Sequence, residues 1–183
     1  MESNVAVHLA DGFEEIEAVS IIDVLRRAGI DTVTVSITGK FEVTGAHGIK
    51  IKADKLFEEV NFDKTGMIVL PGGMPGAKNL KTHSGLRDQI QKFNNSGKPL
   101  GAICAAPMVF GDLGILKNKT ATCFPGFESQ LTGADVTGAE VEVSGNVITG
   151  KGPGVAIKFA LEIVKTLKGE SLAAQLAEDL IMT

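Results

Sequence analysis

The stretch Lys98-Pro99-Leu100-Gly101-Ala102-Ile103-Cys104-Ala105-Ala106-Pro107 decides the fold of this chain. Residues 100–103 form an apolar run of strand length, and residues 105–110 begin a helical pattern. Pro107 falls in the first turn of that helix, where proline is tolerated because its missing amide would have had no helical partner. The pattern predicts a strand-to-helix corner with Cys104 at the bend.

Cys104 has two interpretations on local sequence. A sulfur beside the amides and positive dipole end of a helix has a lowered pKa and forms the reactive thiolate. Free cysteine is also among the most buried residue types, so this run of small residues is also typical of close packing. The other cysteine, Cys123, gives no disulfide framework in a chain of this length, and neither lies in a CxxC pair.

Composition limits the class of protein. With 183 residues, 44% of them hydrophobic, and a mean hydropathy of +0.18, residues 1–183 predict one globular domain. The net charge is −4 with scattered basic residues, so no nucleic-acid footprint is present. We expect no membrane span and no leader, hence a cytoplasmic protein.

The three histidines give no support for a metal site. His8, His47 and His83 each lack a second plausible ligand nearby in sequence, so we expect no metal, and no pattern indicates a cofactor. His47 and His83 stand among polar residues and are expected to be exposed. His8 lies inside an apolar strand pattern and is expected to be a satisfied core histidine.

Strand and helix patterns alternate along the chain. Strands are predicted at 5–10, 31–37, 66–70, 100–103, 119–123, 134–142 and 147–149, a hairpin at 41–51, a helical turn at 56–60, and helices at 14–28, 77–81, 85–95, 155–167 and 171–180. Such alternation predicts a mainly parallel sheet covered on both faces, with sites beyond the carboxyl ends of its strands. The Asp11 turn, the Pro71-Gly72-Gly73 loop and Cys104 all lie at such ends.

Three acids, Glu14, Glu15 and Glu17, open the helix at 14–28, where the helix dipole favours negative charge. For Glu15 this role suffices. Glu14 and Glu17 each head an apolar stripe, and either could be an inward carboxyl whose burial raises its pKa and keeps it protonated. Periodicity does not choose between them.

Several separated motifs together resemble one family. They are LADGFEEIE at 9–17, DVLRRAGI at 23–30, LPGG at 70–73, AICAAP at 102–107 and GPG at 152–154. The chain resembles the ThiJ/PfpI superfamily, and within it the branch of YajL and the Parkinson-disease-associated deglycase. The resemblance covers nearly the whole chain, in order.

This resemblance implies a flavodoxin-like three-layer α/β sandwich, usually a homodimer, with Cys104 at a nucleophile elbow. It implies that Glu17, rather than Glu14, is the protonated carboxyl beside the sulfur, and that the Gly73 and Ala105 amides are the oxyanion donors. Further positions that it places near the site are Gly72, Phe124 and Pro153.

The resemblance also implies a function. It indicates a cofactor-independent enzyme of the glyoxalase III or deglycase type, acting on a small aldehyde such as methylglyoxal, with lactate as product, or on a glycated protein. A Cys-His protease is disfavoured, because Phe124 stands before Pro125 where such members have histidine. The alternative is an oxidative-stress sensor or chaperone activated by oxidation of Cys104 to sulfinate. A third possibility is a dimeric scaffold with a vestigial cysteine, and Cys123 is expected to be secondary or structural.

Overall fold

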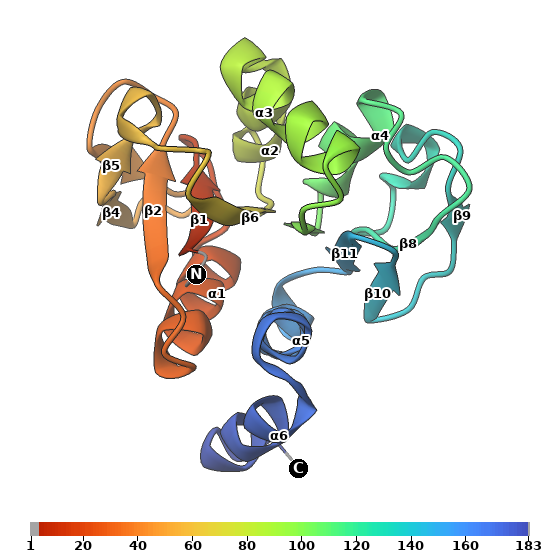
Figure 1. The fold of residues 1–183 in the computed structure, drawn as a ribbon. Coiled ribbons are helices and arrows are strands. Elements are labelled where there is room, and N and C mark those ends of the chain that lie inside the picture. Colours follow the sequence, from red (N-terminus) through yellow and green to blue (C-terminus); the bar gives the residue numbers. More distant parts are fainter. Residues whose placement is uncertain (1–3, 183) are drawn as a thin grey trace.

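A seven-stranded sheet forms the centre of the computed structural model, which describes residues 4–182 (Figure 1). Its strand order is β10-β11-β7-β6-β1-β2-β5, and every neighbouring pair is parallel except β10 with β11. The strands are β1 Asn4–Leu9, β2 Thr32–Ser36, β5 Lys55–Leu56, β6 Thr65–Leu70, β7 Leu100–Ile103, β10 Val141–Ser144 and β11 Val147–Gly150.

The five inner parallel strands confirm the predicted fold class. Side by side across the sheet they lie in the order β2-β1-β6-β7-β11, which is the 2-1-3-4-5 order of flavodoxin-like sheets when these five strands are numbered along the chain. All four residues of β7 are buried, as expected for a strand covered on both faces. The order reverses between β1 and β6, and ligand sites of such sheets lie beyond the carboxyl ends of strands at this point.

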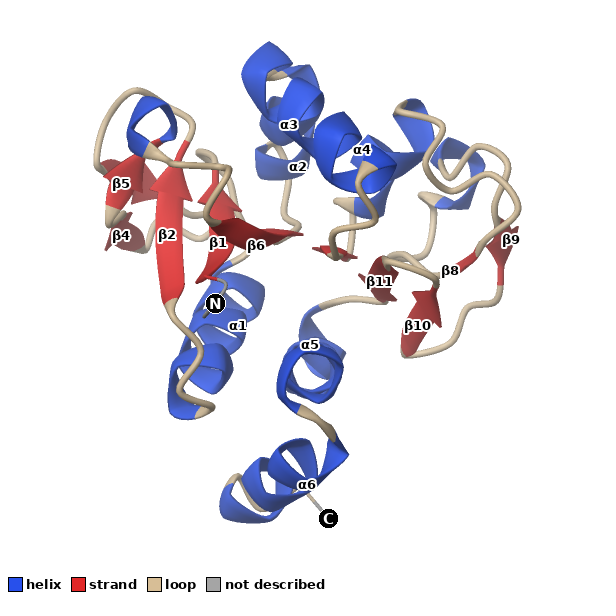
Figure 2. Ribbon diagram, viewed as in Figure 1, coloured by secondary structure: helices blue, strands red, loops and turns tan. Residues whose placement is uncertain are grey.

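Helices cover the two faces of the sheet as separate layers (Figures 1 and 2). One layer holds α1 Glu15–Arg27 and α5 Ala156–Lys168, with α6 Glu170–Asp179 packed outside α5. The other holds α2 Gly76–Thr82, α3 Ser84–Asn95 and α4 Pro107–Asp112. None of the helices between residues 4 and 182 has the length and apolarity to cross a bilayer. Short 3-10 helices lie at η1 Phe57–Glu59, η2 Glu128–Gln130 and η3 Pro153–Val155.

Two small sheets lie outside the central one. The predicted hairpin forms between β3 Glu42–Thr44 and β4 Lys50–Lys52. The strand predicted at 119–123 is largely wrong, because only β8 Thr120–Ala121 is extended, and it pairs with β9 Asp135–Val136. The following amide, that of Thr122, donates to the Thr149 hydroxyl at 3.0 Å and so makes no strand pairing.

Candidate functional site

Cys104 sits at a strained backbone bend directly after β7. Its φ is +65°, in the left-handed region that residues with a Cβ rarely adopt. Both backbone polar groups are fixed: the amide donates to Gly150 O at 2.9 Å, and the carbonyl accepts from Phe124 N at 2.9 Å. A strained residue persists only where its surroundings determine its conformation, and such residues cluster at functional sites. The predicted strand-to-helix corner is therefore present, with the geometry of a nucleophile elbow.

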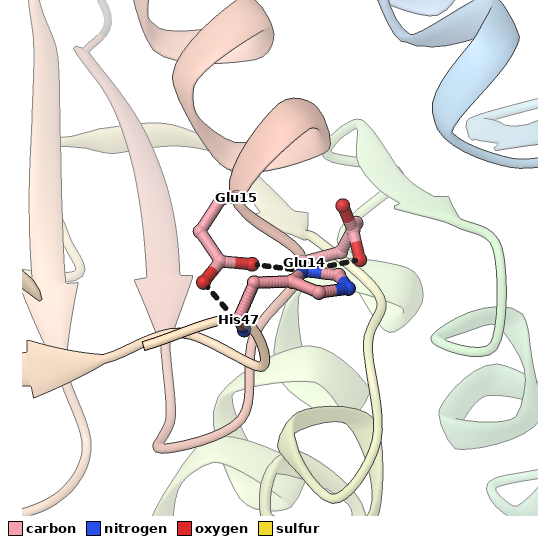
Figure 3. A group of neighbouring side chains, drawn as sticks. All are labelled: Glu14, Glu15 and His47. Carbon is pink, nitrogen blue, oxygen red and sulfur yellow. Dashed lines mark hydrogen bonds and ion pairs between the residues drawn. The ribbon is translucent and has the colours of Figure 1, made fainter. Parts of the chain in front are cut away.

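Glu17, from α1, is the carboxyl that faces this bend. Its side chain is fully buried, and its Oε2 accepts a hydrogen bond from the Gly72 amide at 2.7 Å. Its Oε1 is buried and has no partner of ordinary hydrogen-bond geometry among residues 4–182, yet the carboxyl is close enough to Cys104 for each to shift the other's pKa. Glu14 turns instead toward His47 (Figure 3). The structure thus places Glu17, the carboxyl that the resemblance implies, beside Cys104, whereas helical periodicity alone left Glu14 and Glu17 open.

The Gly72-Gly73 loop after β6 closes the third side of the site. A Cβ on Gly72 would lie 2.6 Å from Cys104 Cβ and 2.8 Å from Glu17 Oε2, so only glycine lets the two side chains meet. Gly73 has a φ of +88°. The amides of Gly73 and Ala105 lie near enough to the Cys104 sulfur to lower the pKa of its thiol, as expected of oxyanion donors.

The pKa of Cys104 corrects one expectation of the sequence analysis. Burial raises it, the Glu17 carboxylate raises it further, and the Gly73 and Ala105 amides lower it, leaving a pKa of about 12. The helix dipole does not overcome burial, because α4 has only six residues and starts at Pro107. Cys104 is 8% exposed, so the residue is nearly enclosed.

Glu17 is shifted in the same direction. Burial raises its pKa to about 7, and the charge of Glu14 adds to this, while the Gly72 amide and Cys104 act to lower it. A carboxyl with this pKa is protonated in a large fraction of molecules at neutral pH. This agrees with the protonated partner that the resemblance implies.

Phe124 and the segment after β11 flank the elbow. The Phe124 ring is held near Gly152, where a Cβ would approach its Cδ2 to 3.1 Å, and the residue is 43% exposed. Pro153 follows Gly152 at the start of η3 and is half-buried. The Phe124 amide is bonded to the Cys104 carbonyl, and Phe124 stands in the sequence where the resemblance places the histidine of Cys-His members.

Glu15 has a further structural role that the sequence did not show. Its Oε1 accepts from the amides of His47 at 2.7 Å and Ile49 at 3.3 Å, and its Oε2 lies 2.9 Å from His47 Nδ1. Burial raises the pKa of Glu15, but these hydrogen bonds outweigh burial and leave it below its ordinary value. Glu15 thereby ties the β3–β4 turn to α1.

The histidines differ from one another. The His47 side chain is 68% exposed, as predicted. His83 is half-buried rather than exposed, because its Nδ1 accepts the Leu86 amide at 3.0 Å and caps α3. His8 is fully buried, but the expectation of a satisfied ring is wrong: neither ring nitrogen has a hydrogen-bond partner within the described residues, and the ring stacks on Phe62. Burial lowers its pKa to about 3.

The sequence also matches a known protein family. Residues 3–166 match the family model described as DJ-1/PfpI. This chain belongs to the DJ-1/PfpI family. The resemblance drawn from the motifs is therefore confirmed, and the fold, with its mainly parallel seven-stranded sheet, matches that of a solved DJ-1 structure.

Relatives within the DJ-1/PfpI family differ in length. Protein DJ-1 homolog B of Arabidopsis thaliana is 42% identical over 175 residues, which are 95% of this chain and 40% of the relative. A Pyrococcus abyssi protein named a deglycase is 32% identical over 161 residues, 87% of this chain and 96% of the relative. The structure of oxidized Toxoplasma gondii DJ-1 superposes with a TM-score of 0.94 and 37% identity, covering 98% of each chain. The chain thus spans less than half the length of the Arabidopsis relative.

Two features of this DJ-1/PfpI site are not visible in the sequence. The positive φ of Cys104 depends on tethers to Gly150 and Phe124, which lie far along the chain. The need for glycine at position 72 arises only once α1 brings Glu17 to the end of β6. The only sequence feature that pointed to this close approach was the pair of glycines that follows the core strand at 66–70.

Proposed function

We propose that this chain is a cofactor-independent enzyme of reactive carbonyls, deglycase-like, that uses Cys104 as nucleophile. The observation that carries the proposal is the strained Cys104 bend held against a fully buried Glu17 and two amide donors. The name of the Pyrococcus relative, a deglycase, supports the same substrate class.

Cys104 and Glu17 act as a pair that shares protons. When Glu17 is protonated, its repulsive charge is absent and its hydroxyl can donate to sulfur, since Oε2 is already occupied by the Gly72 amide. The first proton lost from the pair, near pH 7, can therefore leave the negative charge on sulfur, where the Gly73 and Ala105 amides stabilise it. The Cys104 pKa of about 12 then describes the loss of the second proton, from a pair that already carries one negative charge.

The chemistry balances without an external oxidant or reductant. The Cys104 thiolate forms a bond to the aldehyde carbon of methylglyoxal, and the carbonyl electron pair moves to oxygen, facing the Gly73 and Ala105 amides. Glu17 protonates that oxygen and then takes the proton from the former aldehyde carbon, while the new hydroxyl passes its proton to the ketone oxygen through the enediol. Glu17 returns the carbon-bound proton to the ketone carbon, giving a lactoyl thioester. Water cleaves the thioester, releasing lactate and restoring the thiol. A hemiaminal adduct of methylglyoxal first breaks its carbon–nitrogen bond, the amine leaving with the hydroxyl proton as the aldehyde re-forms, and the same steps then act on that aldehyde.

Turnover should be modest, because no histidine accompanies the sulfur. Phe124, whose amide is bonded to the Cys104 carbonyl, stands at the sequence position where Cys-His members have the imidazole that activates water. Glu17 alone must then serve as acid and base.

A second candidate function rests on the same donors. Two amides that hold an oxyanion would also hold a sulfinate on Cys104, and the Toxoplasma relative is described in an oxidized form. In this case peroxide would be the co-reactant, and the oxidised protein would act as a sensor or chaperone without turnover.

A parallel assay separates the two. Lactate formation from methylglyoxal is measured for the wild type, Cys104→Ser, Glu17→Gln and the control Cys123→Ser, with the oxidation state of each sulfur followed by mass spectrometry. We expect loss of activity in Cys104→Ser, a decrease of about a hundredfold in Glu17→Gln, and wild-type rates in Cys123→Ser. Lactate formation retained in Cys104→Ser would refute the nucleophile. Two oxygens gained at Cys104 without carbonyl turnover would support the sensor instead.

The homodimer and the cytoplasmic location remain predictions. Exposed apolar side chains at Ile16 and Val19 on α1, and at Ile49 beside it, are compatible with a partner subunit.

A further inference from the structure

We propose that Glu14, Glu15 and His47 form a binding site for a divalent cation of the zinc class, where the β3–β4 turn meets the start of α1 (Figure 3). The site uses none of the residues that contact the Cys104 sulfur and does not depend on the proposed function, although the Glu14 charge helps to raise the pKa of Glu17.

The spacing of the donor atoms suits such an ion. One ligand atom from each residue lies within 4.8 Å of the others. His47 Nδ1 is 2.9 Å from Glu15 Oε2 and 3.7 Å from Glu14 Oε2. A tetrahedral ion bound at ordinary zinc–nitrogen and zinc–oxygen distances separates its ligands by about 3.4 Å. A cation can therefore replace the proton between the ring and the carboxylates after small side-chain shifts.

Glu14 supplies the second, independent observation. The residue is 8% exposed and its side chain 11% exposed, and no hydrogen bond to its carboxylate is found in the described part of the chain. The His47 ring is its only ion-pair partner there, at 3.7 Å, beyond hydrogen-bond distance. A largely enclosed carboxylate without hydrogen-bond donors is costly, and a bound cation would compensate it.

Glu15 is already oriented for this purpose. The His47 and Ile49 amides hold its Oε1, so Oε2 is the oxygen that faces the ring. Gly45 keeps the turn close, because a Cβ at that position would overlap the Glu15 carboxyl. Hydrogen bonds that orient a ligand in this way are typical of metal sites.

Charge and access also fit. Two carboxylates and a neutral imidazole carry a charge of −2, which a divalent ion neutralises. The His47 side chain is 68% exposed, so an ion can enter from solvent and keep water as a further ligand. Mixed imidazole and carboxylate ligands favour zinc, cobalt or nickel over calcium and magnesium, which prefer oxygen alone.

No local sequence pattern indicates this metal site, because its ligands are distant from one another in the chain. Glu15 and His47 are 32 positions apart, and the hairpin that joins them is not a metal-binding motif. The fold alone brings the imidazole to the two adjacent carboxylates.

The test is zinc binding by the full chain in a Cys104→Ser background, which removes the sulfur of the elbow. Equilibrium dialysis should give one zinc per chain, and cobalt should bind with a spectrum that lacks a sulfur charge-transfer band. We expect His47→Ala and Glu14→Gln each to weaken binding at least about tenfold. His83→Asn, which keeps a capping side chain on α3, is the matched control and should bind as the parent.

His47→Lys distinguishes a metal site from a simple ion pair. Lysine preserves the positive charge between the glutamates but cannot replace the ring nitrogen, so zinc affinity should fall while thermal stability without metal is kept. Zinc should raise the melting temperature of the parent and not that of His47→Lys. The proposal is overturned if the parent binds no zinc, if these variants bind as the parent does, or if cobalt shows sulfur ligation.

Discussion

Cys104 and Cys123 are alike in the two properties by which reactive thiols are usually sought. They are 8% and 4% exposed, and burial is the first cause that raises the pKa of each, to about 12 and about 11. Neither accessibility nor thiol acidity separates them.

The difference lies in what surrounds each sulfur. Cys104 has a φ of +65°, two amide donors and a carboxyl with a pKa of about 7 in contact. The Cys123 pKa is raised by burial and then by the charge of Glu128, and no hydrogen-bond donor among residues 4–182 lowers it. A cysteine site that can stabilise a thiolate is therefore recognised by nearby amides and by a carboxyl that shares a proton with the sulfur. These groups act on the negative charge once it forms.

The largest effect should come from the carboxyl beside Cys104. The pKa of Glu17 is about 7 in the folded chain and 4.5 ordinarily, so the folded state prefers the protonated form. The protonated Glu17 therefore adds to the free energy of unfolding in full below pH 4.5. This addition is lost as the pH rises through about 7, which lowers the free energy of unfolding by about 3 kcal/mol. Glu17→Gln should not show this loss.

Denaturant unfolding of the wild type and Glu17→Gln between pH 4 and 8 measures this difference. His8, whose pKa is lowered to about 3, adds the opposite trend to both proteins and cancels in the comparison. Glu128→Gln serves as the control, because Glu128 is exposed and should leave the pH dependence unchanged. Parallel curves for the wild type and Glu17→Gln would contradict the shared proton.

Much of this contrast could be predicted from sequence, and particular residues show where prediction ended. The corner at Cys104 was predicted from residues 98–107, because strand, turn and proline signals are local. Glu14 and Glu17 could not be separated, since both head apolar stripes and only the Gly72 amide distinguishes them. Residues 119–123 have strand propensity, but the Thr149 hydroxyl takes the Thr122 amide, which no local pattern reveals. Long-range hydrogen bonds therefore account for most of what was missed.

The next effect concerns the reactivity of the two thiols. At neutral pH the Cys104–Glu17 pair can place its negative charge on sulfur, whereas Cys123 must ionise against burial alone. We expect Cys104 to be alkylated at least about tenfold faster than Cys123 at pH 7. Iodoacetamide labelling with peptide mass spectrometry, repeated from pH 6 to 10, gives both rates in one sample. Faster labelling of Cys123 would reverse the assignment of the reactive sulfur.

The smallest effect should come from the carboxylate near Cys123. Glu128→Gln removes a negative charge but keeps an oxygen that can accept the Gly126 amide, now bonded at 2.7 Å. Because burial is the larger cause of the raised Cys123 pKa, its alkylation at pH 9 should increase by only about threefold, with no change at Cys104. A tenfold increase would mean that charge, rather than burial, keeps Cys123 inert. The low reactivity of Cys123 would then come from one nearby carboxylate, and not from the absence of amides and a shared proton around its sulfur.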